Sequence, residues 1–240
     1  MTLLIVLPTY NERANLPRVV DGILRHDFAH VLVVDDASPD GTGAVADALA
    51  AARPDRVQVL HRSGARGLGV AYIEGLRLAL ESRHAAIGQM DADLSHDPAY
   101  LPALLAALAE HDLVIGSRYL RGVSVVNWPL HRIALSAFAN AYIRTVTGLR
   151  VRDCTSGFRL WRREALARLP LNQARASGYA FLAEMLYHAA RSGCRIGEVP
   201  IIFVEREEGY SKVSSGVLIE SLVTPWRLVL RGGRRRPGAR

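Results

Sequence analysis

The chain has 240 residues, of which 50% are hydrophobic and 22% charged, the balance of an ordinary globular protein rather than a disordered or fibrous one. Its longest stretch without a charge is Pro98–Ala109, twelve residues, well short of the ~18–20 apolar residues that a membrane-spanning helix needs. The apolar run Leu3–Leu7 has no basic residue before it and ends at Pro8, so we expect no secretory signal. Cys154 and Cys194 are too far apart for a CxxC pair, which favours a reducing cytoplasm.

The positive charge is concentrated at the C-terminal end. The net charge at pH 7 is +7, and after Glu220 the chain carries six arginines and no acid, so residues 1–220 hold a net charge of only +1. Such a tail suits an anionic surface, either phospholipid or nucleic acid, although a solvated end that aids solubility has the same composition.

Short apolar runs alternate with segments of helical period through the first 115 residues. The predicted strands are Leu3–Leu7, Val31–Asp35, Val57–Leu60, Ala86–Met90 and Leu113–Ile115. The predicted helices between them are Asn15–Arg25, Thr42–Ala52, Gly69–Ser82 and Pro98–Ala109. This alternation predicts an α/β fold, a mostly parallel sheet with helices on its faces. Ligands then bind at the carboxyl ends of the strands, so the residues that follow each strand bear on the chemistry.

Past residue 120 the pattern changes. Pro129–Gly148 predicts one helix, on which polar side chains recur every four residues and line one face. These side chains are Arg132, Ser136, Asn140 and Arg144. Two further strands, Ser156–Trp161 and Ile196–Val204, are predicted, with a helix at Tyr179–Arg191 between them and an amphipathic segment at Val217–Leu230 that leads into the tail.

The first strand is followed by Pro8-Thr9-Tyr10-Asn11-Glu12 rather than by the GxGxxG of a dinucleotide-binding protein. A nicotinamide or flavin dehydrogenase is therefore disfavoured. The ring of Tyr10 can stack on a planar base, and the carboxylate of Glu12 can accept hydrogen bonds from it. Taken alone, these residues are better explained by a plain turn in which Asn15 caps the next helix.

Three acids within six residues follow the second strand. Asp40 and Thr42 are explained as turn and N-cap residues, whereas Asp35 and Asp36 cannot both be caps. A carboxylate at this position can accept hydrogen bonds from the edge of a nucleobase.

The fourth strand leads into Asp91-Ala92-Asp93-Leu94-Ser95-His96. An extended backbone here places the Asp91 and Asp93 side chains on one face. Two carboxylates so close repel each other unless a divalent cation bridges them to phosphate oxygens. Hard oxygen ligands indicate Mg²⁺ or Mn²⁺ rather than zinc, and we expect His96 to pack or cap rather than to bind the ion.

These motifs, in this order, resemble family-2 glycosyltransferases of the GT-A fold, and most closely the dolichol- or polyprenol-phosphate mannosyltransferase branch. The resemblance rests on residues 8–12, 34–42 and 91–96, and on the later motifs Gly116-Ser117-Arg118-Tyr119, Asp153–Arg159 and Glu205–Lys212. It covers about residues 3 to 215. It implies one catalytic GT-A domain over residues 1–212, a Rossmann-like nucleotide-sugar-binding sheet flanked by helices, with an amphipathic helix and arginine-rich tail over 213–240.

The resemblance also implies roles for individual residues. The guanosine of GDP-mannose would be held by Pro8, Tyr10, Glu12, Val34 and Asp36. Asp91, Ala92 and Asp93 would border its ribose and diphosphate, with Asp93, Asp91 and Ser95 around the metal. Arg118, Arg206 and Lys212 would bind donor phosphates, and Arg132 with Ser136 would bind the acceptor phosphate. The catalytic set would be Asp91, Asp93, Arg118 and Arg132.

The function implied is an inverting, metal-dependent transfer of mannose from GDP-mannose to a polyprenyl or dolichyl phosphate. Such an acceptor is already an anion near neutral pH, because the second pKa of a phosphate monoester is about 6, so its oxygen can attack without a general base. For the same reason we expect a structural or positioning role for Asp153. Nucleic acid is not among the expected partners.

Two alternatives remain open. An enzyme that moves glucose from UDP-glucose to polyprenyl phosphate would share the fold and the metal site, and no residue here is seen to recognise the 2-hydroxyl of the sugar. A non-enzymatic nucleotide-binding membrane protein would have no need of both the acidic pair and the basic set.

The C-terminal segment predicts how the protein meets its lipid. Val217–Leu230 is too short and too charged to span a bilayer, but it can lie in the headgroup plane with Trp226 at the interface. The arginines of the tail would add attraction to anionic lipid, which gives a peripheral protein at the cytoplasmic face of the membrane. In the competing interpretation this helix packs on the catalytic domain and the tail is solvated.

Overall fold

A seven-stranded sheet forms the centre of the computed structural model, which describes residues 1–173, 178–205 and 215–232. The strand order is β3-β2-β1-β4-β7-β5-β8, and β7 runs antiparallel to both neighbours while the other pairs are parallel. The strands are β1 (Leu3–Thr9), β2 (Ala29–Asp35), β3 (Val57–His61), β4 (Ala86–Gln89), β5 (Leu113–Ser117), β7 (Arg159–Arg162) and β8 (Ile196–Pro200). The mostly parallel α/β sheet predicted from the sequence is confirmed.

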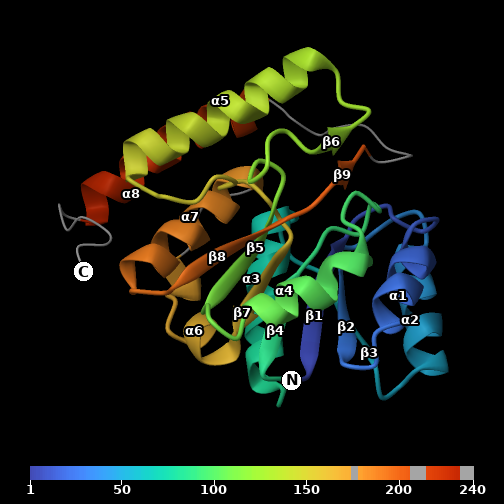
Figure 1. Ribbon diagram of the computed structural model, residues 1–240. Helices are drawn as coiled ribbons and strands as arrows, with labels where there is room; N and C mark the ends of the chain where they lie inside the picture. The colour runs from blue at the N-terminus through green and yellow to red at the C-terminus, as the bar shows by residue number, and fades with distance from the viewer. Residues whose placement is uncertain (174–177, 206–214, 233–240) are drawn as a thin grey trace.

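Helices cover both faces of this sheet, as Figure 1 shows. Leu3, Ile5 and Leu7 of β1 point to one face, where α1 (Leu16–Leu24), α2 (Thr42–Ala52) and α4 (Leu101–Ala107) pack. Leu4 and Val6 point to the other, where α3 (Leu68–Glu81) and α7 (Gly178–Arg191) pack. Side chains alternate between the faces of a strand, so a strand covered on both faces is a continuous apolar run. The shorter helices are η1 (Pro98–Tyr100), α6 (Arg163–Ala167) and η2 (Leu171–Gln173).

Two long helices lie side by side at one end of the molecule, beyond the layers of the sheet (Figure 1). They are α5 (Leu130–Thr147) and α8 (Ser215–Gly232), and the Tyr142 hydroxyl of α5 donates a 2.6 Å hydrogen bond to the carbonyl oxygen of Leu222 in α8. The C-terminal stop of α5 lies at Gly148, as predicted, with a φ of 73° that favours glycine. Within the described helices, none combines the length and apolar composition that crossing a bilayer requires.

Some predicted elements differ from the observed ones. The predicted strand Ile196–Val204 is two strands, because after Pro200 the chain leaves the sheet and β9 (Phe203–Val204) pairs instead with β6 (Val125–Val126). The strand predicted from Ser156 begins at Arg159. The short elements β6 and α6 were not predicted, since two or five residues give no readable period.

Candidate active site

The carboxyl ends of the parallel strands bring the predicted acidic pair to one edge of the sheet. Asp91 follows β4 and its Oδ1 accepts a 3.1 Å hydrogen bond from the hydroxyl of Tyr72, a fully buried residue of α3. A Cβ at Gly157 would lie 3.2 Å from both carboxylate oxygens of Asp91, so glycine at this position leaves room beside the carboxylate. Burial and the charge of Asp91 hold the pKa of Tyr72 well above its ordinary value, which keeps the phenol a hydrogen-bond donor at neutral pH.

Asp93 lies in a bend of the backbone rather than in an extended segment. Leu94 has a φ of 64°, and this turn directs the Ser95 hydroxyl and amide to Oδ1 of Asp93 at 2.5 and 3.1 Å. Residues 92–94 bend, so the extended backbone predicted between Asp91 and Asp93 is wrong. Local side-chain-to-backbone hydrogen bonds of this kind compete with strand geometry.

His96 is occupied by packing. Its Nδ1 accepts a 3.2 Å hydrogen bond from the backbone N–H of Asp91, and its ring lies against Phe158 and Phe203 at centroid distances of 5.2 and 5.4 Å. Burial lowers the pKa of His96 more than the neighbouring carboxylates raise it, so the ring is neutral. His96 therefore positions the loop.

The donor set at this edge fits a hard cation. Within residues 1–173, 178–205 and 215–232 no three His, Cys, Asp or Glu side chains are clustered as metal ligands. Asp91, Asp93 and Ser95 offer oxygen atoms alone, and Gly157 leaves space beside the Asp91 carboxylate. Mg²⁺ is commonly held by one or two protein carboxylates together with oxygens of the substrate phosphates. Asp91 and Asp93 would supply the two carboxylates, so no further protein ligand is needed.

Two arginines not predicted from the sequence lie with the residues expected to hold the nucleoside. The Arg66 guanidinium lies 4.9 Å from the centroid of the Tyr10 ring and donates to the Tyr10 hydroxyl at 3.0 Å. The Asp36 carboxylate accepts hydrogen bonds from Arg62 and, at 2.9 Å, from the Gly67 amide. Both arginines follow β3, whose carboxyl end lies at the same edge of the sheet, and this position is the signal that could have revealed them.

The other predicted nucleoside residues lie at the same edge. Pro8 and Val34 are register partners in β1 and β2, and Glu12 accepts a 2.9 Å hydrogen bond from the Asn15 side chain. Ala92 is buried next to Asp93. Strand pairing thus gathers the motifs after β1, β2 and β4.

Arg118 is held by a buried carboxylate. Its Nε and Nη2 donate to the two oxygens of Asp153, both at 2.7 Å, and its backbone N–H donates to Oδ2 at 2.9 Å. Nη2 also donates to Thr155 at 2.8 Å. Burial raises the pKa of Asp153, but the charge and hydrogen bonds of Arg118 outweigh that effect and the pKa lies below its ordinary value.

Arg132 lies on the same side of the molecule. Its guanidinium is 4.2 Å from the centroid of the Trp128 ring and forms an ion pair with Glu205. Arg118 lies 5.7 Å from the same ring, so Trp128 joins the two arginines. Phe203 packs between Trp128 and His96, at 5.4 Å from each ring, which links the arginines to the acidic loop.

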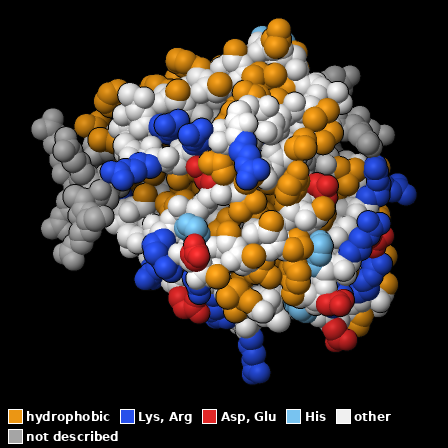
Figure 2. Space-filling view, viewed as in Figure 1, with side chains coloured by type: hydrophobic (Ala, Val, Ile, Leu, Met, Phe, Trp, Pro, Cys, Tyr) orange, Lys and Arg blue, Asp and Glu red, His pale blue; other side chains and the backbone are white. Residues whose placement is uncertain are grey.

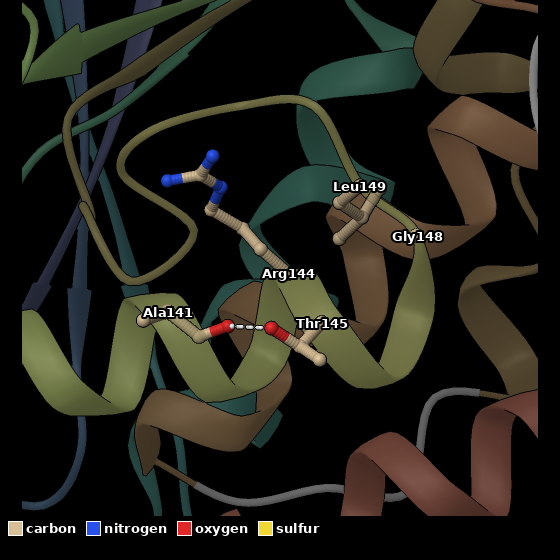
Figure 3. A pocket seen from close by; sticks show the side chains of 5 residues that line it. All are labelled: Ala141, Arg144, Thr145, Gly148 and Leu149. Atoms are coloured by element: carbon tan, nitrogen blue, oxygen red, sulfur yellow. Dashed lines mark hydrogen bonds between the residues drawn. The ribbon is translucent and has the colours of Figure 1, made fainter.

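The predicted polar stripe of α5 is divided. Ser136 accepts a 2.7 Å hydrogen bond from the Tyr119 hydroxyl, and Asn140 accepts one of 2.7 Å from the Cys154 amide, so both face the sheet domain. Arg144 is exposed and lines an open cavity of about 340 Å³ with Ala141, Thr145, Gly148 and Leu149 (Figure 3). None of the predicted site residues lines this cavity. Arg206 and Lys212 lie outside the described residues.

Comparison with known proteins identifies the family. The family model "Glycosyl transferase family 2" matches residues 4–169. The chain belongs to glycosyltransferase family 2. A polyprenol monophosphomannose synthase of Mycolicibacterium smegmatis is 46% identical over 228 residues, 93% of this chain and 86% of that protein. An undecaprenyl-phosphate mannosyltransferase of Micrococcus luteus is 47% identical over 237 residues, 96% of each chain.

Solved structures show the fold of this family-2 glycosyltransferase to be GT-A. Glucosyl-3-phosphoglycerate synthase from Mycobacterium tuberculosis, in complex with Mn²⁺, uridine-diphosphate and phosphoglyceric acid, matches with a TM-score of 0.67 and 22% identity. The match covers 93% of this chain and 78% of that one. The same enzyme with Mn²⁺ and UDP-glucose matches with a TM-score of 0.63 and 21% identity over 92% and 75% of the two chains. The expected family and fold are confirmed.

Proposed function

We propose that this glycosyltransferase transfers mannose from GDP-mannose to a polyprenyl (dolichyl-type) phosphate and releases GDP, with inversion at the anomeric carbon. The observation that carries the proposal is the 46–47% identity, over nearly the whole chain, to two proteins named for mannosyl transfer to polyprenyl phosphates. The site chemistry supports it, because Arg118 and Arg132 share Trp128 close to the acidic loop. Two anionic groups need such a set of cations to approach each other.

In the proposed donor site, the base stacks near Tyr10 and Arg66, and Asp36 and Glu12 accept hydrogen bonds from it. Asp91 and Asp93 hold a divalent ion, Mg²⁺ or Mn²⁺, which when bound would neutralise diphosphate charge. The structural relatives with Mn²⁺ in their names support an ion of this class. Asp153 already fixes the orientation of the Arg118 guanidinium. Arg118 can therefore stabilise the negative charge that develops on the leaving diphosphate without first changing its position. Arg206 and Lys212 are proposed to bind the same diphosphate.

In the proposed acceptor site, Arg132 and Ser136 bind the lipid phosphate. The ion pair with Glu205 keeps the Arg132 guanidinium in place before the acceptor arrives. The acceptor phosphate then binds Arg132 either beside Glu205 or in its place. An acceptor oxygen forms a bond to the anomeric carbon while the bond from that carbon to the donor diphosphate breaks. Because the acceptor is already ionised, no side chain has to remove a proton.

A donor comparison tests the proposal. The purified chain, undecaprenyl phosphate and Mn²⁺ are incubated with GDP-mannose or UDP-glucose, and the lipid product is identified by mass spectrometry. We expect transfer from GDP-mannose to be at least about tenfold faster, and the product to be the β-mannosyl phosphate by NMR. Faster transfer from UDP-glucose would replace the mannosyl assignment with the glucosyl one, and retention of configuration would exclude a single displacement.

The proposal also includes the predicted place of action, the cytoplasmic face of the membrane, with α8 and the arginine tail at the lipid surface. Leu222, Val223, Trp226 and Leu230 of α8 are exposed in the structure, while Thr224, Pro225 and Leu228 are buried against the rest of the chain. One face of α8 thus packs on the domain, as the competing interpretation has it, and the other faces outward. The side chains of Val217 and Leu218 lie outside the described residues, and Val229 is half-buried.

A further inference from the structure

The loop of residues 152–157 contacts both parts of the candidate site. Its Asp153 carboxylate bonds to the guanidinium of Arg118, and its Gly157 adjoins the carboxylate of Asp91. The loop belongs to neither a helix nor a strand, so its backbone N–H and C=O groups need other partners. Two charged side chains outside the predicted site supply several of them.

The carboxylate of Glu198 in β8 binds the start of this loop. Its Oε2 and Oε1 accept hydrogen bonds from the backbone N–H groups of Arg152 and Asp153, at 2.9 and 3.0 Å. The next N–H group, that of Cys154, donates to the side chain of Asn140 in α5 at 2.7 Å. Side chains of two other elements therefore hold three consecutive backbone donors, and the charged acceptor makes the stronger bonds.

Arg159, the first residue of β7, binds the end of the same loop. Its Nε donates to the carbonyl oxygen of Ser156 at 2.8 Å, and its Nη2 donates to that of Cys154 at 2.9 Å. Its Nη1 donates to the carbonyl oxygen of Leu182 in α7 at 2.7 Å. A guanidinium presents five N–H donors in a rigid fork, whereas a lysine ammonium carries three at one point, so arginine suits three separate carbonyls.

Arg159 is a fully buried charge. Figure 2 shows Lys and Arg side chains at the surface, their usual place, whereas Arg159 is 0% exposed. Burial lowers the pKa of Arg159 to about 10, which leaves the guanidinium charged at neutral pH. Because burying a charge is costly and often adds nothing to stability, the geometry of its bonds explains this arginine better than stability does.

Arg159 and Glu198 lie at the same level of the sheet, on either side of the strand that leads to Arg118. Ile115 of β5 is the register partner of Arg159 in β7 and of Glu198 in β8, the two neighbouring strands (Figure 1). Register partners point to the same face of a sheet. Strand β5 ends two residues after Ile115, and Arg118 follows. The two opposite charges therefore hold the loop beside the end of this strand, where the loop meets Arg118.

We infer that Glu198 and Arg159 form a clamp that positions Arg118 for glycosyl transfer: they hold the loop of residues 152–157, and the loop holds the Arg118 guanidinium at the donor diphosphate. This rests on the proposed function, in which Arg118 binds that diphosphate, and adds two positioning residues that act on Arg118 only through the loop. A misplacement of ~1 Å at a group that contacts the substrate can lower the rate about a hundredfold.

Two conservative variants test the clamp. Glu198→Gln replaces one acceptor oxygen by an N–H donor that faces a backbone N–H, and Arg159→Lys keeps the charge but loses the fork. We expect each to lower kcat about tenfold, as changes in residues that orient active-site groups do, with little change in the KM for the lipid phosphate. Glu81→Gln and Arg83→Lys are the matched controls, since both residues are exposed at the end of α3, and both should keep wild-type rates.

A double-mutant cycle shows whether the effect passes through Arg118. In Arg118→Lys the fork that Asp153 and Thr155 hold is gone, so Glu198→Gln should lower kcat less than about twofold in that background. A loss of about tenfold that persists in Arg118→Lys would overturn the clamp. Wild-type rates in Glu198→Gln and Arg159→Lys would overturn it too. If Arg159→Lys does not fold, the Glu198→Gln cycle alone decides.

Calorimetry with GDP or UDP plus Mn²⁺ separates the clamp from folding and from the proposed function. Every variant should keep the wild-type number of nucleotide sites per chain, and a fall in that number that accounts for the lost rate would reduce Glu198 to a structural role. If no protein transfers mannose, the proposed function fails, and the cycle is read in the affinity for whichever nucleotide binds. The clamp stands if Glu198→Gln weakens that affinity in the wild type but not in Arg118→Lys, and it fails otherwise.

Discussion

Helices α1 and α5 both contain apolar residues at helical spacing, but they turn these residues in opposite directions, α1 toward the sheet and α5 outward. α1 buries Leu16, Val19, Val20 and Ile23 against the sheet, as a surface helix of a globular domain does. α5 buries Asn140 and Thr147 beside Ile143, and leaves Leu135 and Phe138 exposed. Helix α1 is therefore held by apolar packing, whereas α5 combines the packing of Ile143 with polar bonds of Ser136 and Asn140 and presents Leu135 and Phe138 outward. An amphipathic pattern therefore predicts a helix but does not indicate which side of that helix faces the protein.

The largest effect is expected on the sheet side of the molecule, at the acidic loop after β4. Asp93→Asn should lower metal-dependent turnover about a thousandfold, because a lost metal ligand costs several kcal/mol of transition-state stabilisation. The measurement is the initial rate over a Mn²⁺ titration, with circular dichroism to confirm folding. Asp97→Asn is the matched control, since Asp97 is exposed and only caps η1. Unchanged rates in Asp93→Asn would remove the acidic pair from the site.

At the α5 end, the buried pair of Asp153 and Arg118 should matter most for stability. Asp153→Asn leaves the Arg118 guanidinium without its carboxylate, and breaking a buried pair lowers the free energy of unfolding by about 3–5 kcal/mol. Urea unfolding measures this. Asp112→Asn, which breaks a pair with the exposed Arg195, should lower the free energy of unfolding much less. Equal losses in the two variants would contradict the role given to the buried pair.

The same pair predicts a pH dependence. The folded-state pKa of Asp153 is lowered, so its contribution to stability is complete above the unfolded value of about 3.9 and is lost as the pH falls through the folded value. The wild type should therefore lose stability below about pH 4 more steeply than Asp153→Asn. The urea midpoint is measured between pH 2 and 6, a window set at about the unfolded pKa. If the urea midpoints of the two proteins fall in parallel as the pH is lowered, another carboxylate causes the loss of stability in acid.

A smaller effect is expected where the two regions meet, at Arg132. Arg132→Ala should raise the KM for the lipid phosphate about 10–100-fold, since a hydrogen bond to a charged group is worth about 1.5–3 kcal/mol. GDP affinity in the presence of Mn²⁺, measured by calorimetry, should be almost unchanged. Arg144→Ala, on the exposed end of the same helix, is the control. An equal loss of GDP affinity would place Arg132 in the donor site.

The smallest effect is expected at Tyr72, which the sequence did not single out. Tyr72→Phe removes the hydrogen bond to Asp91 and should raise the Mn²⁺ concentration needed for half-maximal rate about tenfold, as outer-shell changes do. Saturating Mn²⁺ should restore the rate, which separates a positioning role from loss of folding. Tyr187→Phe on α7 serves as control. A lowered rate that Mn²⁺ cannot restore would contradict the role.

The first 115 residues were predictable because local pattern and tertiary outcome agree there. Leu3–Leu7 is apolar at every position and lies in a central strand covered on both faces, so no other placement satisfies it. Asp91 and Asp93 were predicted as site residues because they follow such a strand. Arg62 and Arg66 also follow a strand, but their contacts with Asp36 and Tyr10 could not be predicted because strand pairing brings these distant residues together.

The order of strands and helices over the first 115 residues, the mostly parallel sheet and the edge at which the candidate site was expected follow from the sequence alone, since the 2.0 and 3.6 residue periods and the position of polar residues after strands are local properties. The pairing of Asp153 with Arg118 and the outward orientation of the apolar side of α5 became evident only in the folded structure. The bend at Asp93 instead comes from local hydrogen bonds with Ser95. The ion pair and the orientation of α5 depend on contacts between distant segments, because a buried charge or an amphipathic helix can find its partner on either side until the chain has packed.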